Sequence, residues 1–188
     1  MERSDPRPWR VLDEEHLQDC KVFDVHRATM ASPRTGDAHP FYRIESPAWV
    51  NVVALTAEEE LVMVRQFRHG SRVVTLEIPG GLVDPGETPA EAAGRELLEE
   101  TGYRAGRLES LGSINPNPAL FANRCHMQVA FDCRAGGEIQ NSATEETMVE
   151  LLPLSELPDV LRSGAIDHAL VVAALYAFEL RRSGTPSS

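Results

Sequence analysis

The stretch that decides the fold is GLVDPGETPAEAAGRELLEETGY, residues 81–103. Its second half predicts a helix, because Thr88 can cap the N-terminus and Pro89 suits the first helical position. Glu91 stands three residues after Thr88, which completes the pattern of a capping box. Gly102 is expected to end the helix, so the sequence fixes both ends.

Three carboxylates share one side of this predicted helix. Glu96, Glu99 and Glu100 recur at helical spacing, and like charges placed so destabilise an isolated helix. They could form a solvated acidic surface, or they could hold a counter-charge, for which Mg²⁺ is the natural candidate because it prefers oxygen ligands. The opposite side is small or apolar and can pack against a sheet: Ala90, Ala93, Gly94 and Leu97.

The loop before the helix favours the cation site. Gly80 and Gly81 let the backbone come close to the helix and present carbonyl groups beside the carboxylates. Arg95 can pair with Glu87 through a forked guanidinium contact and so hold the loop onto the helix.

The spacing of these residues resembles a known family motif. Gly81, five residues, Glu87, seven residues and then Arg95–Tyr103 resemble the Nudix box, G-x5-E-x7-R-E-U-x-E-E-x-G-U with U aliphatic. Only Tyr103, at the last aliphatic position, departs from it. The resemblance implies an α/β (α+β) fold, a Nudix-type α/β/α sandwich with a mixed β-sheet. It also implies hydrolysis of a nucleoside diphosphate linked to another moiety, with Mg²⁺ or Mn²⁺ as cofactor.

The resemblance also implies roles for individual residues. The expected metal ligands are three carboxylates and one backbone carbonyl: Glu96, Glu99, Glu100 and Gly80. Of these, Glu99 and Glu100 are also expected to be catalytic. The expected structural residues are a salt bridge and two glycines: Glu87, Arg95, Gly81 and Gly102.

The segments around the box are similar to the ADP-ribose and nucleotide-sugar pyrophosphatase branch. The similar residues are Val64–Arg68 and Leu76–Gly81. Arg65 and Arg68 fall on one predicted strand, and we expect them to share a face and reach a diphosphate together. They could instead be solvated arginines.

Other candidate site residues lie outside the box. Pro118 stands sixteen residues after Gly102, where this branch places a proline associated with ADP-ribose, although its neighbours lack the usual Ser-Pro-Gly character. Trp49 and Phe121 are further candidates for contact with the substrate. A late-loop carboxylate often assists the attacking water in this branch, and either Glu145 or Glu146 could be that base.

Two other functions remain open from the sequence. One is hydrolysis of nucleoside triphosphates or capped RNA ends, and the other is a non-catalytic nucleotide-sensing module. With 18 basic and 29 acidic residues the formal net charge is −11, which disfavours binding of long nucleic acid. The module is disfavoured because every metal carboxylate is present.

The rest of the chain predicts strands and two further helices. Residues 1–46 are expected to form an N-terminal antiparallel β extension, which the resemblance places in a homodimer interface. Residues 47–182 are expected to be the Nudix domain, and 183–188 a flexible tail. Ser155 is expected to cap a short helix, and Asp167 to cap a helix over His168–Arg182.

The sequence also favours a cytoplasmic protein. Three cysteines cannot all pair, and the first ten residues lack the apolar stretch of a signal peptide. The longest apolar run, Ala169–Phe178, is too short to cross a membrane. We therefore expect no membrane association.

Overall fold

The computed structural model describes residues 5–184, which fall into two compact units. One unit comprises residues 5–47 with 115–123, and the other comprises 48–114 with 124–184. Residues 1–4 of the predicted extension and 185–188 of the predicted tail lie outside the described residues.

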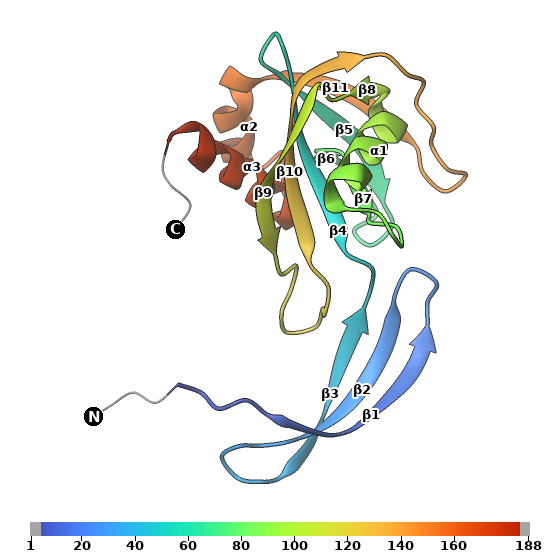
Figure 1. Ribbon diagram of the computed structural model, residues 1–188, viewed down its shortest axis with the longest axis vertical. Helices are drawn as coiled ribbons and strands as arrows, with labels where there is room; N and C mark the ends of the chain where they lie inside the picture. The colour runs from blue at the N-terminus through green and yellow to red at the C-terminus, as the bar shows by residue number, and fades with distance from the viewer. Residues whose placement is uncertain (1–4, 185–188) are drawn as a thin grey trace. The chain divides into compact units, whose positions relative to one another are not determined.

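The N-terminal unit contains a three-stranded antiparallel sheet in the order β1-β2-β3 (Figure 1). The strands are β1 Arg10–Asp19, β2 Asp24–Ala31 and β3 Ala38–Glu45. The predicted antiparallel β extension is confirmed. All ten residues of β1 are exposed, so no apolar alternation marks this strand in the sequence.

The second unit is built on a mixed sheet. Its strands are β4 Trp49–Thr56, β5 Glu60–Arg68, β6 Val73–Glu77, β7 Gly80–Leu82, β8 Tyr103–Arg104, β9 Arg107–Ile114, β10 Cys125–Ala135 and β11 Thr147–Pro153. The main path is β11-β5-β4-β10-β8, with β6 on β5, β7 on β4 and β9 on β10. Strands β4 and β10 are parallel and the other pairs are antiparallel, which confirms the predicted mixed sheet.

Helices cover both faces of this sheet (Figure 1). Helix α1 (Pro89–Thr101) packs on one face, where Ala92, Ala93 and Leu97 join a buried cluster with residues of β4. Helices α2 (Leu157–Ser163) and α3 (Ala169–Arg182) pack in a second cluster on the other face. The expected α/β/α sandwich is therefore confirmed.

The ends of α1 are as predicted. The Thr88 hydroxyl accepts a hydrogen bond from the Glu91 N–H, and the Glu91 carboxylate accepts one from the Thr88 N–H. Gly102 ends the helix in the left-handed conformation, with φ of 71°. The buried side differs in one place, because Ala92 is buried where the sequence placed Ala90, which is exposed.

Two predicted caps are wrong. Helix α2 begins after a 3-10 turn with Glu156 at its N-cap, so Ser155 lies inside the turn and caps nothing. The N-cap of α3 is His168 instead of Asp167, and its side chain makes no capping hydrogen bond. That side chain is engaged elsewhere, as shown below.

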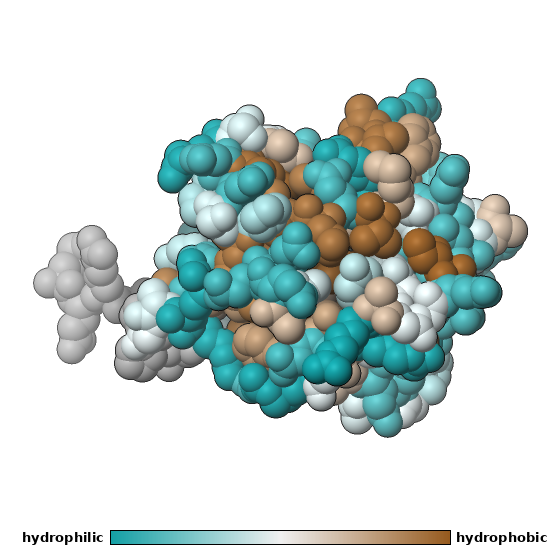
Figure 2. Space-filling model, turned by 90° about the horizontal axis from the view of Figure 1, so that it is seen from above, coloured by the Kyte–Doolittle hydropathy of each residue, from teal (hydrophilic) through white to brown (hydrophobic). Residues whose placement is uncertain are grey.

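The surface mixes hydrophobic and hydrophilic residues. On the face drawn in Figure 2, hydrophobic residues gather toward the middle and hydrophilic residues surround them. Within residues 5–184, no helix is both long and apolar enough to cross a membrane.

Candidate active site

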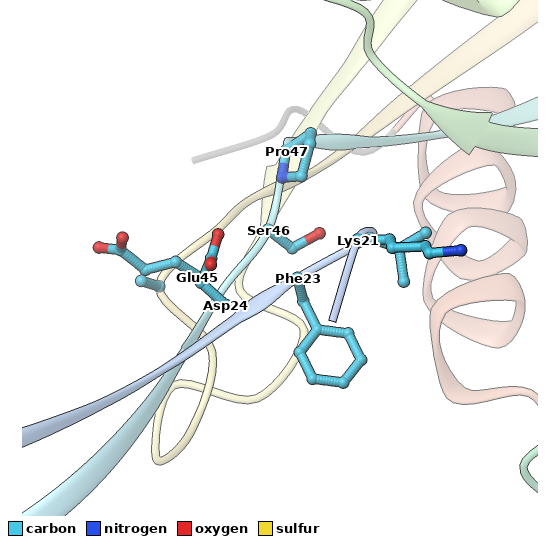
Figure 3. A pocket seen from close by; sticks show the side chains of 8 residues that line it. Lys21, Phe23, Asp24, Glu45, Ser46 and Pro47 are labelled. Carbon is cyan, nitrogen blue, oxygen red and sulfur yellow. The ribbon is translucent and has the colours of Figure 1, made fainter. Parts of the chain in front are cut away.

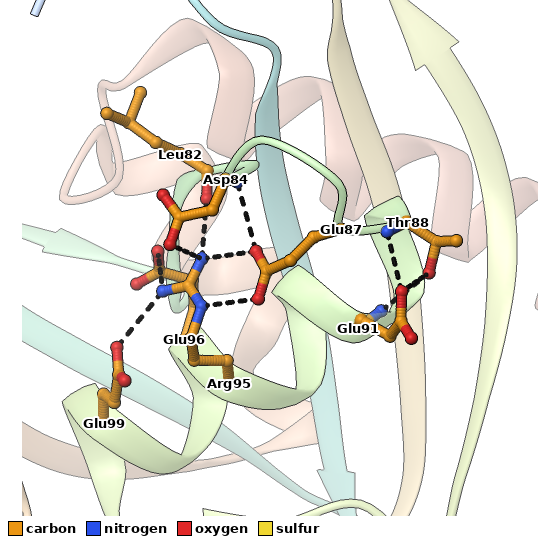
Figure 4. Close-up of polar contacts among 8 residues, drawn as sticks. All are labelled: Leu82, Asp84, Glu87, Thr88, Glu91, Arg95, Glu96 and Glu99. Atoms are coloured by element: carbon orange, nitrogen blue, oxygen red, sulfur yellow. Dashed lines mark hydrogen bonds and ion pairs between the residues drawn. The ribbon is translucent and has the colours of Figure 1, made fainter.

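Arg95 organises the loop and the acidic side of α1 (Figure 4). Its Nε and Nη2 atoms donate to the two carboxylate oxygens of Glu87, each at 2.9 Å. The Nη2 atom also donates to the Leu82 carbonyl at 2.9 Å, and Nη1 donates to Glu96 and Glu99 at 2.8 and 3.2 Å. All five donors of the guanidinium are used, and the hydrogen bond to Glu87 raises the pKa of Arg95.

The two glycines of the loop are required because neighbouring atoms leave no room for a side chain at either position. A Cβ atom on Gly81 would lie 2.3 Å from Oε1 of Glu96, and one on Gly80 would lie 2.3 Å from the Val50 carbonyl oxygen. The Gly80 N–H donates to Oε2 of Glu100 at 2.9 Å. The loop therefore holds two carboxylates of α1 directly against its backbone.

Burial dominates the electrostatics of these two carboxylates, although Arg95 donates a hydrogen bond to Glu96. Burial raises the pKa of Glu100 to about 8, with a further contribution from Glu96, although the Gly80 N–H and the charge of Arg68 partly oppose this. Burial also raises the pKa of Glu96, which Arg95 partly offsets. A buried set of oxygen donors that resists carrying negative charge fits a hard divalent cation.

Glu99 is more exposed than Glu96, at 38% against 13% of the side chain, and it accepts a hydrogen bond from the same Nη1 atom of Arg95. Within residues 5–184, no three His, Cys, Asp or Glu side chains come close enough together to hold a metal ion. The role of Glu99 as a ligand remains a prediction.

Arg65 and Arg68 do not share a face, contrary to the sequence analysis. They are three residues apart on β5, whose ladder with β6 is regular, and residues at an odd spacing point to opposite faces. Arg65 donates to Glu150 of β11 at 2.5 Å. Arg68 pairs instead with Glu77 of β6, and its charge acts on Glu100. We assign Arg68 to the acidic site because its charge opposes the raised pKa of Glu100.

Glu77 is a residue that the sequence analysis missed. It is 1% exposed and accepts hydrogen bonds from Arg68, Thr75 and His168. Burial alone would raise the pKa of Glu77, but these hydrogen bonds outweigh burial and hold it well below its usual range. Its place in Leu76-Glu77-Ile78, an acid between apolar residues on a strand, was the available signal.

The segment before β11 is tied to the end of α1. The Thr147 hydroxyl donates to the Glu100 carbonyl at 2.8 Å, and the Gln140 N–H donates to the Glu99 carbonyl at 2.7 Å. The charge of Glu145, which lies between these anchors, contributes to raising the pKa values of Glu96 and Glu100.

A cleft of about 1150 Å³ opens beside this segment and the end of β5. Its lining includes both predicted arginines, Arg65 and Arg68, together with Gln66, Glu145 and Glu146. Gln66 is 8% exposed, and its amide nitrogen has no hydrogen-bond partner within residues 5–184. Buried donors are nearly always paired, so this amide is a group suited to an incoming acceptor.

The structure does not test the predicted substrate contacts of three residues. Pro118 and Phe121 belong to the N-terminal unit, where Phe121 bridges to Ile44 of β3. Trp49 begins β4 and pairs with Leu82 of β7 and Cys125 of β10. Their contact with a substrate remains a prediction.

A second cavity, of about 430 Å³, lies within the N-terminal unit (Figure 3). Its charged lining residues are Lys21, Asp24 and Glu45. Figure 3 shows the Lys21 amine on one side of Phe23 and the two carboxylates on the other. Its polar groups do not converge, so this cavity does not form a comparable site.

Fold and site together define a class of protein: an α/β/α sandwich in which a glycine loop and one acidic helix form a candidate divalent-cation site. The family model for the NUDIX domain matches residues 46–175. The chain belongs to the Nudix family and is a Nudix hydrolase.

Two relatives and one solved structure illustrate the similarity. An ADP-ribose pyrophosphatase of Bacillus subtilis (strain 168) is 30% identical over 153 residues, which cover 81% of this chain and 81% of the relative. An ADP-sugar pyrophosphatase of Mus musculus is 28% identical over 94% of this chain and 88% of its own. The crystal structure of an ADP compounds hydrolase superposes with a TM-score of 0.84 at 25% identity, covering 98% of this chain and 100% of that one.

Proposed function

We propose that this chain hydrolyses the diphosphate bond of a nucleoside diphosphate linked to a sugar, with ADP-ribose or a related nucleotide sugar as the substrate. The products are a nucleoside monophosphate and a sugar phosphate. The observation that carries the proposal is the pair of buried carboxylates, Glu96 and Glu100, held against Gly80 and Gly81, with the charge of Arg68 acting on Glu100. The names of the relatives, which act on ADP-ribose or ADP-sugars, support this substrate class.

The proposed cofactor is Mg²⁺ or Mn²⁺. Glu96 and Glu100 would hold the ion, together with Glu99 and the Gly80 carbonyl. The fit rests on the chemistry of the donors, which are all oxygens, and on burial, which raises the pKa values of Glu96 and Glu100. A bound divalent ion neutralises phosphate oxygens, which reconciles a chain of net charge −11 with an anionic substrate.

The protein groups divide into those that bind and those that move a proton. Arg68 uses Nε and Nη2 on Glu77, and its Nη1 makes no hydrogen bond within residues 5–184, so it can donate to a phosphate oxygen. Glu145 is the proposed base for the attacking water. It is favoured over Glu146 because its charge acts on Glu96, Glu100 and Arg68.

The test is turnover by purified protein with Mg²⁺ on a panel of ADP-ribose, other nucleotide sugars, nucleoside triphosphates and capped RNA. Cleavage of nucleotide sugars supports the proposal, and exclusive cleavage of triphosphates or caps contradicts it. Binding of nucleotides without turnover would indicate a sensing module.

A second measurement identifies the broken bond. In ¹⁸O-labelled water, the label is expected in one of the two product phosphates, since residues 5–184 offer no arranged Ser, Cys or His nucleophile. Label on the anomeric carbon, with release of a nucleoside diphosphate, would mean glycosidic cleavage and contradict the proposal.

We also propose that residues 1–46 form a homodimer interface. All residues of β1 are exposed, and the unit leaves large apolar side chains at its surface: Trp9, Val11, Leu12, Leu17, Phe41 and Tyr42. Such exposed apolar area is typical of an interface. Light scattering should give a dimer for the wild type and a smaller mass for Phe41→Asp. A monomeric wild type would contradict the proposal.

The proposed compartment is the cytoplasm. Cys20, Cys125 and Cys133 are all unpaired, and burial raises the pKa values of Cys125 and Cys133 to about 11. Thiols of this kind are typical of a reducing compartment.

A further inference from the structure

Glu77 sits at the centre of a buried network that joins three distant parts of the chain. Arg68 is on β5, Glu77 is on β6 and His168 is the N-cap of α3, so 91 residues separate Glu77 from His168. The Glu77 side chain is only 2% exposed. A carboxylate buried so completely requires partners for both oxygens.

The structure supplies a partner for every acceptor position of this carboxylate. Oε1 accepts from Arg68 Nε at 2.7 Å and from the Thr75 hydroxyl at 2.6 Å. Oε2 accepts from Arg68 Nη2 at 2.6 Å and from His168 Nδ1 at 2.7 Å. Because an ionised carboxylate only accepts, the His168 proton must be on Nδ1.

His168 serves this network instead of its own helix. An N-cap side chain usually accepts a hydrogen bond from the first turn, but His168 makes no such bond. Ile166, 3% exposed within the α2–α3 cluster, anchors the backbone just before it. The start of α3 therefore directs a donor at Glu77.

Glu77 in turn restrains Arg68, the arginine assigned to the acidic site. With the Nε–Nη2 edge fixed on Glu77, the orientation of the guanidinium plane is set, and Nη1 is the end left without a partner within residues 5–184. The Arg68 side chain is 42% exposed, so without this anchor it would sample many rotamers.

We propose that His168 is a positioning residue that acts through Glu77 to hold Arg68 in the orientation in which its Nη1 meets the substrate diphosphate. The inference rests on the proposed function for the identity of the ligand. It assigns a role in substrate binding to a residue at the start of α3, on a helix that packs on the opposite face of the sheet from α1.

The test is a double-mutant cycle read by equilibrium binding. The probe is the α,β-methylene analogue of ADP-ribose, which cannot be cleaved at the diphosphate, measured by calorimetry with Mg²⁺. His168→Leu removes the donor and should weaken binding by about tenfold, the scale of a charge-assisted hydrogen bond. His168→Asn keeps a donor near Nδ1 and should restore affinity to within about twofold of the wild type.

The second side of the cycle uses Arg68→Lys, which keeps a positive charge beside Glu77 but loses the paired hydrogen bonds from Nε and Nη2. In that background His168→Leu should change affinity by less than about twofold, because the residue through which it acts is already altered. Equal losses in both backgrounds would mean a general structural role and overturn the proposal. Asp167→Asn, exposed and adjacent, is the matched control and should bind as the wild type.

A ligand-free measurement separates this proposal from the proposed function. The Arg68 Nε–H resonance should be sharp and slowly exchanging in the wild type and His168→Asn, and broadened in His168→Leu. If the wild type fails to bind the analogue, the proposed function fails, and this resonance still decides the positioning role. An unchanged resonance in His168→Leu overturns that role.

Discussion

Replacing Arg95 by lysine keeps the positive charge but changes the number and geometry of its donors. Arg95 makes five hydrogen bonds, to Glu87 twice, to the Leu82 carbonyl, to Glu96 and to Glu99. A lysine ammonium has three donors, so at least two of the five bonds are lost.

The expected cost follows from this count. Each net hydrogen bond contributes roughly 0.5–1.5 kcal/mol, so Arg95→Lys should lower the free energy of unfolding by about 1–3 kcal/mol. A loss of about 2 kcal/mol corresponds to roughly 4–8 °C in Tm for a chain of this size. Activity should fall together with stability, because the residues 82–87 would no longer be held beside Glu96.

Urea unfolding followed by circular dichroism measures the free energy, and hydrogen exchange of residues 82–88 measures the local loosening. The matched control is Arg162→Lys, whose Arg162 pairs with Asp159 and is 71% exposed, so its change should stay below about 0.5 kcal/mol. If Arg95→Lys unfolds like the wild type yet loses activity, Arg95 contacts the substrate and the structural assignment is wrong.

Three further outcomes are expected. Glu100→Gln removes a charged ligand at nearly constant volume, so turnover at saturating Mg²⁺ should drop by orders of magnitude while circular dichroism stays unchanged; near wild-type turnover would refute the assignment. Glu145→Gln should lower kcat far more than Glu146→Gln in steady-state assays, and the reverse order would exchange their roles. Glu77→Gln should lower stability by about 1–3 kcal/mol at neutral pH. Because the folded pKa of Glu77 lies below its unfolded value, this stabilisation is present above about pH 4.5 and lost as pH falls toward the folded pKa. Urea unfolding of both proteins from pH 7 to pH 3 should therefore show a difference that shrinks as the pH falls through about 4.5; a constant difference would exclude the linkage.

Features carried by neighbouring residues were predictable from the sequence. The capping box of Thr88 and Glu91, the end of α1 at Gly102 and the pairing of Arg95 with Glu87 all appear in the structure as expected. These interactions span at most eight residues, so propensity and helical spacing are enough to define them.

Features that depend on strand order and packing were predicted poorly. Arg65 and Arg68 are three residues apart, so strand geometry alone places them on opposite faces, but which strands supply their partners, β11 and β6, depends on strand order. Strand β1 carries no apolar alternation, so only its pairing with β2 reveals it.

The sequence by itself determined the family, the acidic helix and the loop that Arg95 fastens to it. Only the tertiary structure decided that His168 and Arg68 both meet Glu77, and that the charges of Arg68 and Glu145 act on Glu100. The physical reason is the separation along the sequence of the residues that interact. Helix caps and salt bridges within one turn or two are encoded by spacing, whereas contacts between residues tens of positions apart depend on sheet register and helix packing. Register and packing are set by burial of the whole core, and no local pattern of residues records them.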